Sequence, residues 1–204
     1  SLPGCAVIPA PYREREQISF ETGKRIVGMV HEDLKPSKIM TRKAFENAVI
    51  VASAIGGSSN CTTHLIAIAN HMGIKFDLSN WQKLGHKIPL LVNCQPAGEY
   101  LMESFFRAGG VPAVMKELIK NKKIHTNIMT VTGKTVGINL KRKIDVDPKV
   151  IKTFKNSLEE NAGFLVMKSN FFSSAIMKTS VISKEFRDRY LSDPKNLNVF
   201  NGKA

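Results

Sequence analysis

The residues best suited to binding a ligand form one short loop, Gly56-Gly57-Ser58-Ser59-Asn60. Residues 44–55 before it are almost wholly apolar, and residues 65–72 after it are apolar at helical spacing, so the sequence predicts two helices joined by a Gly-Gly hinge. We expect Ser58 or Ser59 to cap the second helix. Ser58, Ser59 and Asn60 would then gather hydroxyls and N–H groups at a helix N-terminus, where an anionic group binds favourably. A plain helix joint with an ordinary Ser cap explains the same pattern, so this site is a hypothesis.

The elements around this loop predict an α/β domain. Helices are expected at residues 14–31, in a short segment around Trp81 that begins at Asp77 or Ser79, at a segment ending near residue 108, and at residues 112–120. Thr41 is the expected cap of the helix before the hinge, and residues 34–37 are an expected loop. The apolar run 89–93 follows a proline and predicts a buried strand.

The alternation of helix, strand and helix favours a parallel sheet. Ligands bind at the carboxyl ends of the strands in such sheets, so Asn93, Cys94 and Gln95 are candidates to line a pocket. A polar strand-to-helix turn explains these three residues equally well.

The pattern changes near residue 156. Residues 163–167 and 175–182 are typical of strands separated by a polar turn, and residues 183–191 are typical of a helix with Phe186 and Tyr190 one turn apart. The predicted domains are therefore residues 1–150, the α/β part, and residues 151–204, a linker with the opening strands of a β-rich, barrel-like domain.

Composition excludes several classes of protein. The 204 residues, 43% of them hydrophobic, can bury a substantial core, and they contain no apolar run long enough to span a membrane and no visible secretory signal. Cys5, Cys61 and Cys94 form no CxxC pair, which favours a reducing cytoplasm over a disulfide framework or zinc ribbon. Cys61 and His64 lie one helical turn apart, but two ligands are too few for a closed metal site.

The formal net charge of +13 is uneven. Residues 116–155 hold 11 Lys and Arg against 3 Asp and Glu, a local net charge of +8. Such a segment attracts nucleic acid or an acidic partner. Phe154 is its one aromatic residue and no nucleic-acid motif is present, so a solvated basic face is favoured. Thr132-Gly133-Lys134-Thr135 imitates a P-loop, but the motif requires a glycine where Ile128 stands.

Several blocks carry a resemblance along nearly the whole chain. They are Ser1-Leu2-Pro3-Gly4, residues 32–41 and 44–48, the Gly56-Gly57-Ser58-Ser59-Asn60 loop with His64-Leu65, residues 107–114, residues 130–135, and Ser174-Ala175-Ile176-Met177-Lys178. Together they resemble the family of dihydroxy-acid and sugar-acid (aldonate and phosphogluconate) dehydratases. Trp81-Gln82, Gly85-His86 and residues 91–101 are more similar to the sugar-acid branch.

The resemblance implies a hydro-lyase that converts a 2,3-dihydroxy acid, here a sugar acid, into a 2-keto-3-deoxy acid. It also implies an iron–sulfur cluster (2Fe-2S), Mg²⁺ and a homo-oligomeric assembly. By this resemblance the cluster cysteines and Mg²⁺ ligands lie before Ser1 and the catalytic serine lies after Ala204. We therefore expect an internal fragment that is inactive by itself, without catalytic or metal-binding residues, in which Ser58, Ser59 and Asn60 are the substrate-side candidates. The alternative is a non-catalytic basic module for a nucleic-acid or protein partner.

Overall fold

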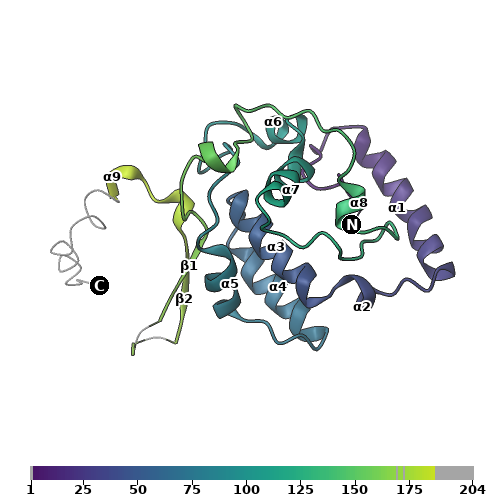
Figure 1. Ribbon diagram of the computed structural model, residues 1–204, viewed down its shortest axis with the longest axis horizontal. Helices are drawn as coiled ribbons and strands as arrows, with labels where there is room; N and C mark the ends of the chain where they lie inside the picture. Colours follow the sequence, from purple (N-terminus) through teal and green to yellow (C-terminus); the bar gives the residue numbers. More distant parts are fainter. Residues whose placement is uncertain (1, 169, 172, 187–204) are drawn as a thin grey trace.

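The structure, a computed structural model, describes residues 2–168, 170–171 and 173–186. Long connecting segments join the helices, and the two short strands come late in the chain, after α8 (Figure 1). The α-helices are α1 (Glu14–His31), α2 (Pro36–Ile39), α3 (Arg42–Ala54), α4 (Asn60–His71), α5 (Leu78–Gly85), α6 (Met102–Arg107), α7 (Gly110–Lys120), α8 (Val136–Asn139) and α9 (Lys184–Phe186). The strands are β1 (Phe164–Met167) and β2 (Ala175–Lys178), and the 3₁₀ turns are η1 (Phe154–Asn156) and η2 (Thr179–Val181).

Helix α3 is the centre of the fold, because it packs against α4, α5 and α7. Its apolar residues are shared between two buried clusters. The first joins the end of α3 to residues 88–94, α6 and α7, and the second joins α3 to α4, α5 and β1. Both faces of α3 are thereby covered, which explains why residues 44–55 are almost wholly apolar.

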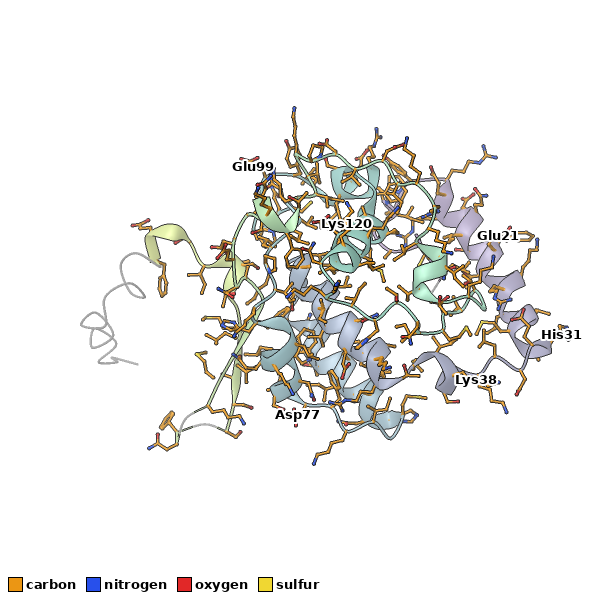
Figure 2. All side chains as sticks on the ribbon, viewed as in Figure 1. Glu21, His31, Lys38, Asp77, Glu99 and Lys120 are labelled. Atoms are coloured by element: carbon orange, nitrogen blue, oxygen red, sulfur yellow. The ribbon has the colours of Figure 1, made fainter. Side chains whose placement is uncertain are left out.

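Most helix ends lie where local signals predict them. Helix α1 covers residues 14–31 as expected, α4 ends before Gly73, and α5 begins after Asp77. The Asp77 carboxylate accepts a hydrogen bond from Ser79 N at 2.9 Å, and Asn80 Oδ1 accepts one from Asp77 N, which completes a capping box. Asp77 is labelled at the start of this helix in Figure 2.

Two local predictions need correction. Thr41 occupies the cap position of α3, but its hydroxyl makes no cap hydrogen bond and is buried without a partner among the residues described. Residues 34–37 were predicted as a loop, but Pro36 and Ser37 open the short helix α2, because Pro36 at its first position already has the backbone φ angle of a helix.

The predicted parallel sheet is absent from the described residues. The run 89–93 is extended and its apolar side chains are buried, as expected, but it pairs only through single bridges, Leu90 with Glu159 and Val92 with Ile151, both antiparallel. Leu91 N donates to the α3 carbonyl of Ala54 at 2.8 Å. A strand needs continuous neighbours for its N–H and C=O groups, and here those groups are bound by irregular segments. The fold is therefore α/β only in the general sense.

The two strands form the predicted hairpin. They are antiparallel, with Phe164 opposite Lys178 and Met167 opposite Ala175. The hairpin packs on α5 through Phe164, whose ring meets Trp81 edge-on at 5.0 Å, and it lies on the opposite side of the molecule from α1 (Figure 1). The second strand ends at Lys178 rather than at residue 182, since η2 follows it. Of the helix predicted at 183–191, α9 covers three residues, and Tyr190 lies outside the described residues.

Candidate functional site

The Gly-Gly-Ser-Ser loop forms one wall of a pocket of about 550 Å³. This volume lies within the range of about 300–1,000 Å³ that is typical of small-molecule sites. Four segments meet here: the loop, the chain after residue 91, helix α6 and the end of the hairpin. The lining residues are Ile55, Gly56, Gly57, Ser58, Ser59, Val92, Cys94, Gln95, Pro96, Met102, Phe105, Lys178 and Val181.

The loop has its shape because α3 ends in a Schellman motif. Gly57 N donates to Ala52 O at 2.8 Å and Gly56 N donates to Ser53 O at 3.1 Å, while Gly56 adopts a φ of +63°. The following residues turn at once into α4. Ser58 Oγ accepts a hydrogen bond from Asn60 N at 3.2 Å, so Ser58 satisfies one free N–H of the first turn. Ser59 occupies the cap position without a side-chain cap bond.

The end of the hairpin covers this loop closely. A Cβ atom on Gly56 would lie 2.9 Å from Leu90 Cδ1, 3.5 Å from Ser180 Oγ and 3.9 Å from Lys178 Cε. Glycine at position 56 therefore permits both the positive φ and the close approach of β2 and η2. The contact also brings Lys178 to the pocket, across more than 100 residues of sequence from the loop.

Lys178 brings a positive charge to a pocket whose lining is largely apolar. Its side chain is half-buried, and burial lowers its pKa below the ordinary lysine value, while the nearby Cys61 has the smaller, opposite effect. In the described part of the chain no carboxylate lies within ion-pair distance of it. The hydroxyl of Ser180, a residue that lines a neighbouring pocket, is buried and has no hydrogen-bond partner within the described residues.

The structure brings most of the candidate residues together. Ser58 and Ser59 line the pocket, and so do Cys94 and Gln95, whereas Asn60 begins α4 beside it without being part of the lining. Asn93 faces a second pocket instead, where its side-chain Oδ1 accepts from Glu99 N at 3.0 Å. We did not predict Lys178, Met102, Phe105 or Val181 from the sequence. The one available signal was that Lys178 ends a block that carried the family resemblance.

Comparison with known proteins decides the family. The profile of the dihydroxy-acid/6-phosphogluconate dehydratase N-terminal domain matches residues 1–139. The chain belongs to this dehydratase family. The predicted resemblance is thus confirmed.

Similar proteins in the family include two sugar-acid dehydratases. A D-xylonate dehydratase of Caulobacter vibrioides is 50% identical over 204 residues, which cover 100% of this chain and 34% of the relative. An L-arabinonate dehydratase of Rhizobium leguminosarum bv. trifolii is 42% identical over 184 residues, 90% of this chain and 32% of the relative. A dihydroxy-acid dehydratase of Halothermothrix orenii is 41% identical over 170 residues, 83% of this chain and 31% of the relative. These names agree with the sugar-acid branch, and the chain spans about a third of the length of these relatives.

The dehydratase family implies an iron–sulfur cluster and Mg²⁺, and the described residues do not fit either group. Within residues 2–168, 170–171 and 173–186, no three His, Cys, Asp or Glu side chains come close enough to hold a metal ion. Cys5, Cys61 and Cys94 are all free thiols, and burial raises the pKa of Cys94, which disfavours the thiolate that a metal requires. Cys61 and His64 gain no third ligand from the part of the chain that the structure describes.

The basic segment 116–155 is partly engaged within the dehydratase fold. Lys116 Nζ donates to Arg142 O at 2.8 Å, Lys120 pairs with Glu117 at 3.4 Å, and Lys123 lies over the Phe154 ring. Lys120, the last residue of α7, is labelled in Figure 2. Binding of nucleic acid or a protein partner here remains an untested alternative. Among the described residues, no helix has both the length and the apolar character needed to cross a membrane.

Proposed function

We propose that the full-length protein containing this chain is a hydro-lyase that dehydrates a 2,3-dihydroxy acid, specifically an aldonic sugar acid, to a 2-keto-3-deoxy acid. The C2 proton and the C3 hydroxyl leave as water, and the resulting enol tautomerises to the keto acid. The observation that carries this proposal is a Gly-Gly-Ser-Ser pocket wall in a chain that is 50% identical, over its whole length, to a D-xylonate dehydratase. D-xylonate and L-arabinonate are accordingly the substrates to test first.

In this proposal the chain binds substrate and leaves the bond-breaking groups to other parts of the protein. Ser58 and Ser59 present hydroxyls to the pocket, and the first turn of α4 adds backbone N–H groups and the positive end of its dipole. Asn60 supports the site indirectly, because its N–H donates to Ser58 Oγ. We assign no general base, cluster ligand or Mg²⁺ ligand within the described residues, and we expect the 204-residue chain alone to be inactive.

The larger architecture is also part of the proposal. We place residues 1–150 in the N-terminal α/β domain and residues 151–204 in a linker and the opening of a β-rich domain.

We also propose a cytoplasmic location and a homo-oligomeric assembly. Free cysteines at positions 5, 61 and 94 support a reducing compartment, the cytoplasm. A homo-oligomer is supported by the apolar side chains that α1 exposes, including Phe20 at 67% and Val30 at 74% exposure.

The experiment is an assay of 2-keto acid formation by the full-length protein with D-xylonate and L-arabinonate. We expect turnover, and we expect the double variant S58A/S59A to lower kcat/KM about tenfold or more through lost hydrogen bonds. Ser19→Ala, on the exposed face of α1, is the matched control and should have no effect. If S58A/S59A instead lowers only stability, the serines are ordinary caps. If neither acid nor a branched 2,3-dihydroxy acid is dehydrated, the function is wrong.

A further inference from the structure

A tightly bonded turn after Asn93 carries Gln95 to the pocket. Asn93 is only 7% exposed, and its Oδ1 accepts from Glu99 N at 3.0 Å while its Nδ2 donates to Glu99 Oε2 at 3.3 Å. Gln95 N donates to Tyr100 O at 2.9 Å. The turn closes so tightly that a Cβ on Gly98 would lie 2.4 Å from Asn93 Oδ1. The backbone of Gln95 therefore has a fixed position in the pocket wall.

The Gln95 amide differs from the other polar side chains that line the pocket. Ser58 Oγ already accepts a hydrogen bond from Asn60 N at 3.2 Å, and the Lys178 ammonium can donate but not accept. The Gln95 side chain is exposed and makes no hydrogen bond within the described residues. A carboxamide offers two N–H donors and one carbonyl acceptor, and adjacent hydroxyl groups of a ligand can use both kinds of group.

Hydroxyls beyond C3 distinguish a sugar acid from a branched 2,3-dihydroxy acid. Both acids carry the carboxylate and the hydroxyls on C2 and C3. A five-carbon sugar acid has further hydroxyls on C4 and C5, whereas the branched acid ends in methyl groups. A site that hydrogen-bonds these distal hydroxyls rejects an acid that lacks them, because its own polar groups then stay unpaired. Most of the described lining residues have no polar side-chain atom, so few other groups can bind such hydroxyls.

We infer that Gln95 is a specificity-determining residue, whose side-chain amide binds the hydroxyls on C4 and C5 of a sugar-acid substrate. The inference rests on the proposed function, because it names the part of the acid that this wall of the pocket holds. The turn fixed by Asn93 supports the contact, since a positioned group loses less conformational entropy when a ligand binds. Gln95 stays away from the carboxylate and from the reacting carbons, so its loss changes the choice of substrate more than the chemistry.

This role predicts effects that depend on the acid. Gln95→Met removes the amide and keeps an unbranched side chain of similar length. The variant should retain the melting temperature of the wild type, because the exposed Gln95 side chain makes no hydrogen bond within the described fold. It should use the sugar acid poorly and the branched acid as before. A residue that only supported the fold would instead lower the melting temperature and the activity with both acids.

The test uses the full-length holoenzyme with Gln95→Met and the control Gln17→Met, which changes an exposed glutamine of α1. The acids are D-xylonate or L-arabinonate, whichever is dehydrated faster, and 2,3-dihydroxy-3-methylbutanoate. For Gln95→Met we expect kcat/KM for the sugar acid to fall about 10- to 100-fold. The branched acid should keep its kcat/KM or, where it only inhibits, its inhibition constant. Gln17→Met should behave as wild type with both acids.

The 4-deoxy and 5-deoxy forms of the sugar acid identify the hydroxyls that Gln95 binds. In the wild type, removing such a hydroxyl should lower kcat/KM about tenfold. In Gln95→Met the same removal should have little further effect, because the amide and the hydroxyl act as one interacting pair.

Three results would overturn the inference and leave the proposed function intact. They are an unchanged kcat/KM of Gln95→Met for the sugar acid, equal losses with both acids, and fully additive losses with both deoxy acids. If the wild type dehydrates neither sugar acid, the proposed function fails instead. Isothermal titration calorimetry with D-xylonate then tests the contact by itself. Binding that Gln95→Met weakens about tenfold or more would support it, and binding that the variant retains, or no binding to the wild type, would refute it.

Discussion

Replacing Gly56 by alanine tests whether the hairpin is packed against the loop as the pocket requires. Gly56 stands at the C′ position of the Schellman motif that ends α3, with a φ of +63°, and a Cβ there would lie 2.9 Å from Leu90 Cδ1. Leu90 is only 2% exposed, so it has little room to move. The matched control is Gly73, which holds the same position in the motif that ends α4, with a φ of +73° and no atom within 4 Å of a Cβ.

The two variants separate backbone strain from packing. Gly73→Ala should lower the free energy of unfolding by about 1–2 kcal/mol, the cost of a left-handed conformation with a Cβ. Gly56→Ala adds the cost of overpacking at Leu90, and we expect about 2–5 kcal/mol in all. Replacing glycine by alanine also lowers the conformational entropy of the unfolded chain, which stabilises both variants by a similar amount. This effect cancels when the free energies of unfolding of the two variants are subtracted.

Urea denaturation followed by tryptophan fluorescence measures both values. Trp81 is the single tryptophan of the chain, is fully buried, and contacts Phe164 of the hairpin. Its emission therefore reports on the part of the fold that holds the pocket. If Gly56→Ala destabilises the chain no more than Gly73→Ala, within about 0.5 kcal/mol, the close packing of Leu90, β2 and η2 on the loop is refuted.

Two further predictions follow from single contacts. Asp77→Ala should lower the free energy of unfolding by about 1 kcal/mol through the lost cap. The pKa of Asp77 is lowered in the folded protein, mainly by the hydrogen bond from the Ser79 side chain. The stability that the Asp77 carboxylate contributes is therefore present above its pKa in the unfolded chain and disappears as the pH falls through its pKa in the folded protein. An equal loss of stability at acidic and neutral pH would contradict this prediction. Asn47→Ala should cost about 2–4 kcal/mol in urea denaturation, because the buried Asn47 side chain donates to the backbone carbonyl of His125 at 2.8 Å and accepts from its N–H at 2.8 Å; a loss under about 0.5 kcal/mol would show that water replaces both bonds.

The sequence predicts features that depend on neighbouring residues. Helix α1 and the ends of α4 and α5 follow from helical periodicity, Gly73 and the Asp77 capping box, all of which act within a few residues. The turn at Gly56 follows for the same reason. Ser58 and Ser59 were found as candidates because a Ser pair after Gly-Gly marks a helix start wherever the chain folds.

Features that depend on distant contacts were missed or wrong. Residues 89–93 form a strand only if other segments pair with them, and here the partners are Glu159 and Ile151. An apolar run in the sequence does not show which distant segments will pair with it. Thr41 lies at a cap position, yet its hydroxyl is buried by tertiary packing, which residue preferences for helix caps cannot predict. Lys178 is typical of an exposed strand end until the hairpin is placed over Gly56, so only the fold could identify it as part of the pocket.

The most direct test of the account is a crystal structure of the full-length protein with D-xylonate bound. The account predicts that the acid lies in the pocket formed by the Gly-Gly-Ser-Ser loop, against Ser58 and Ser59 at the start of α4. An acid bound at another surface, out of contact with both serines, would contradict it.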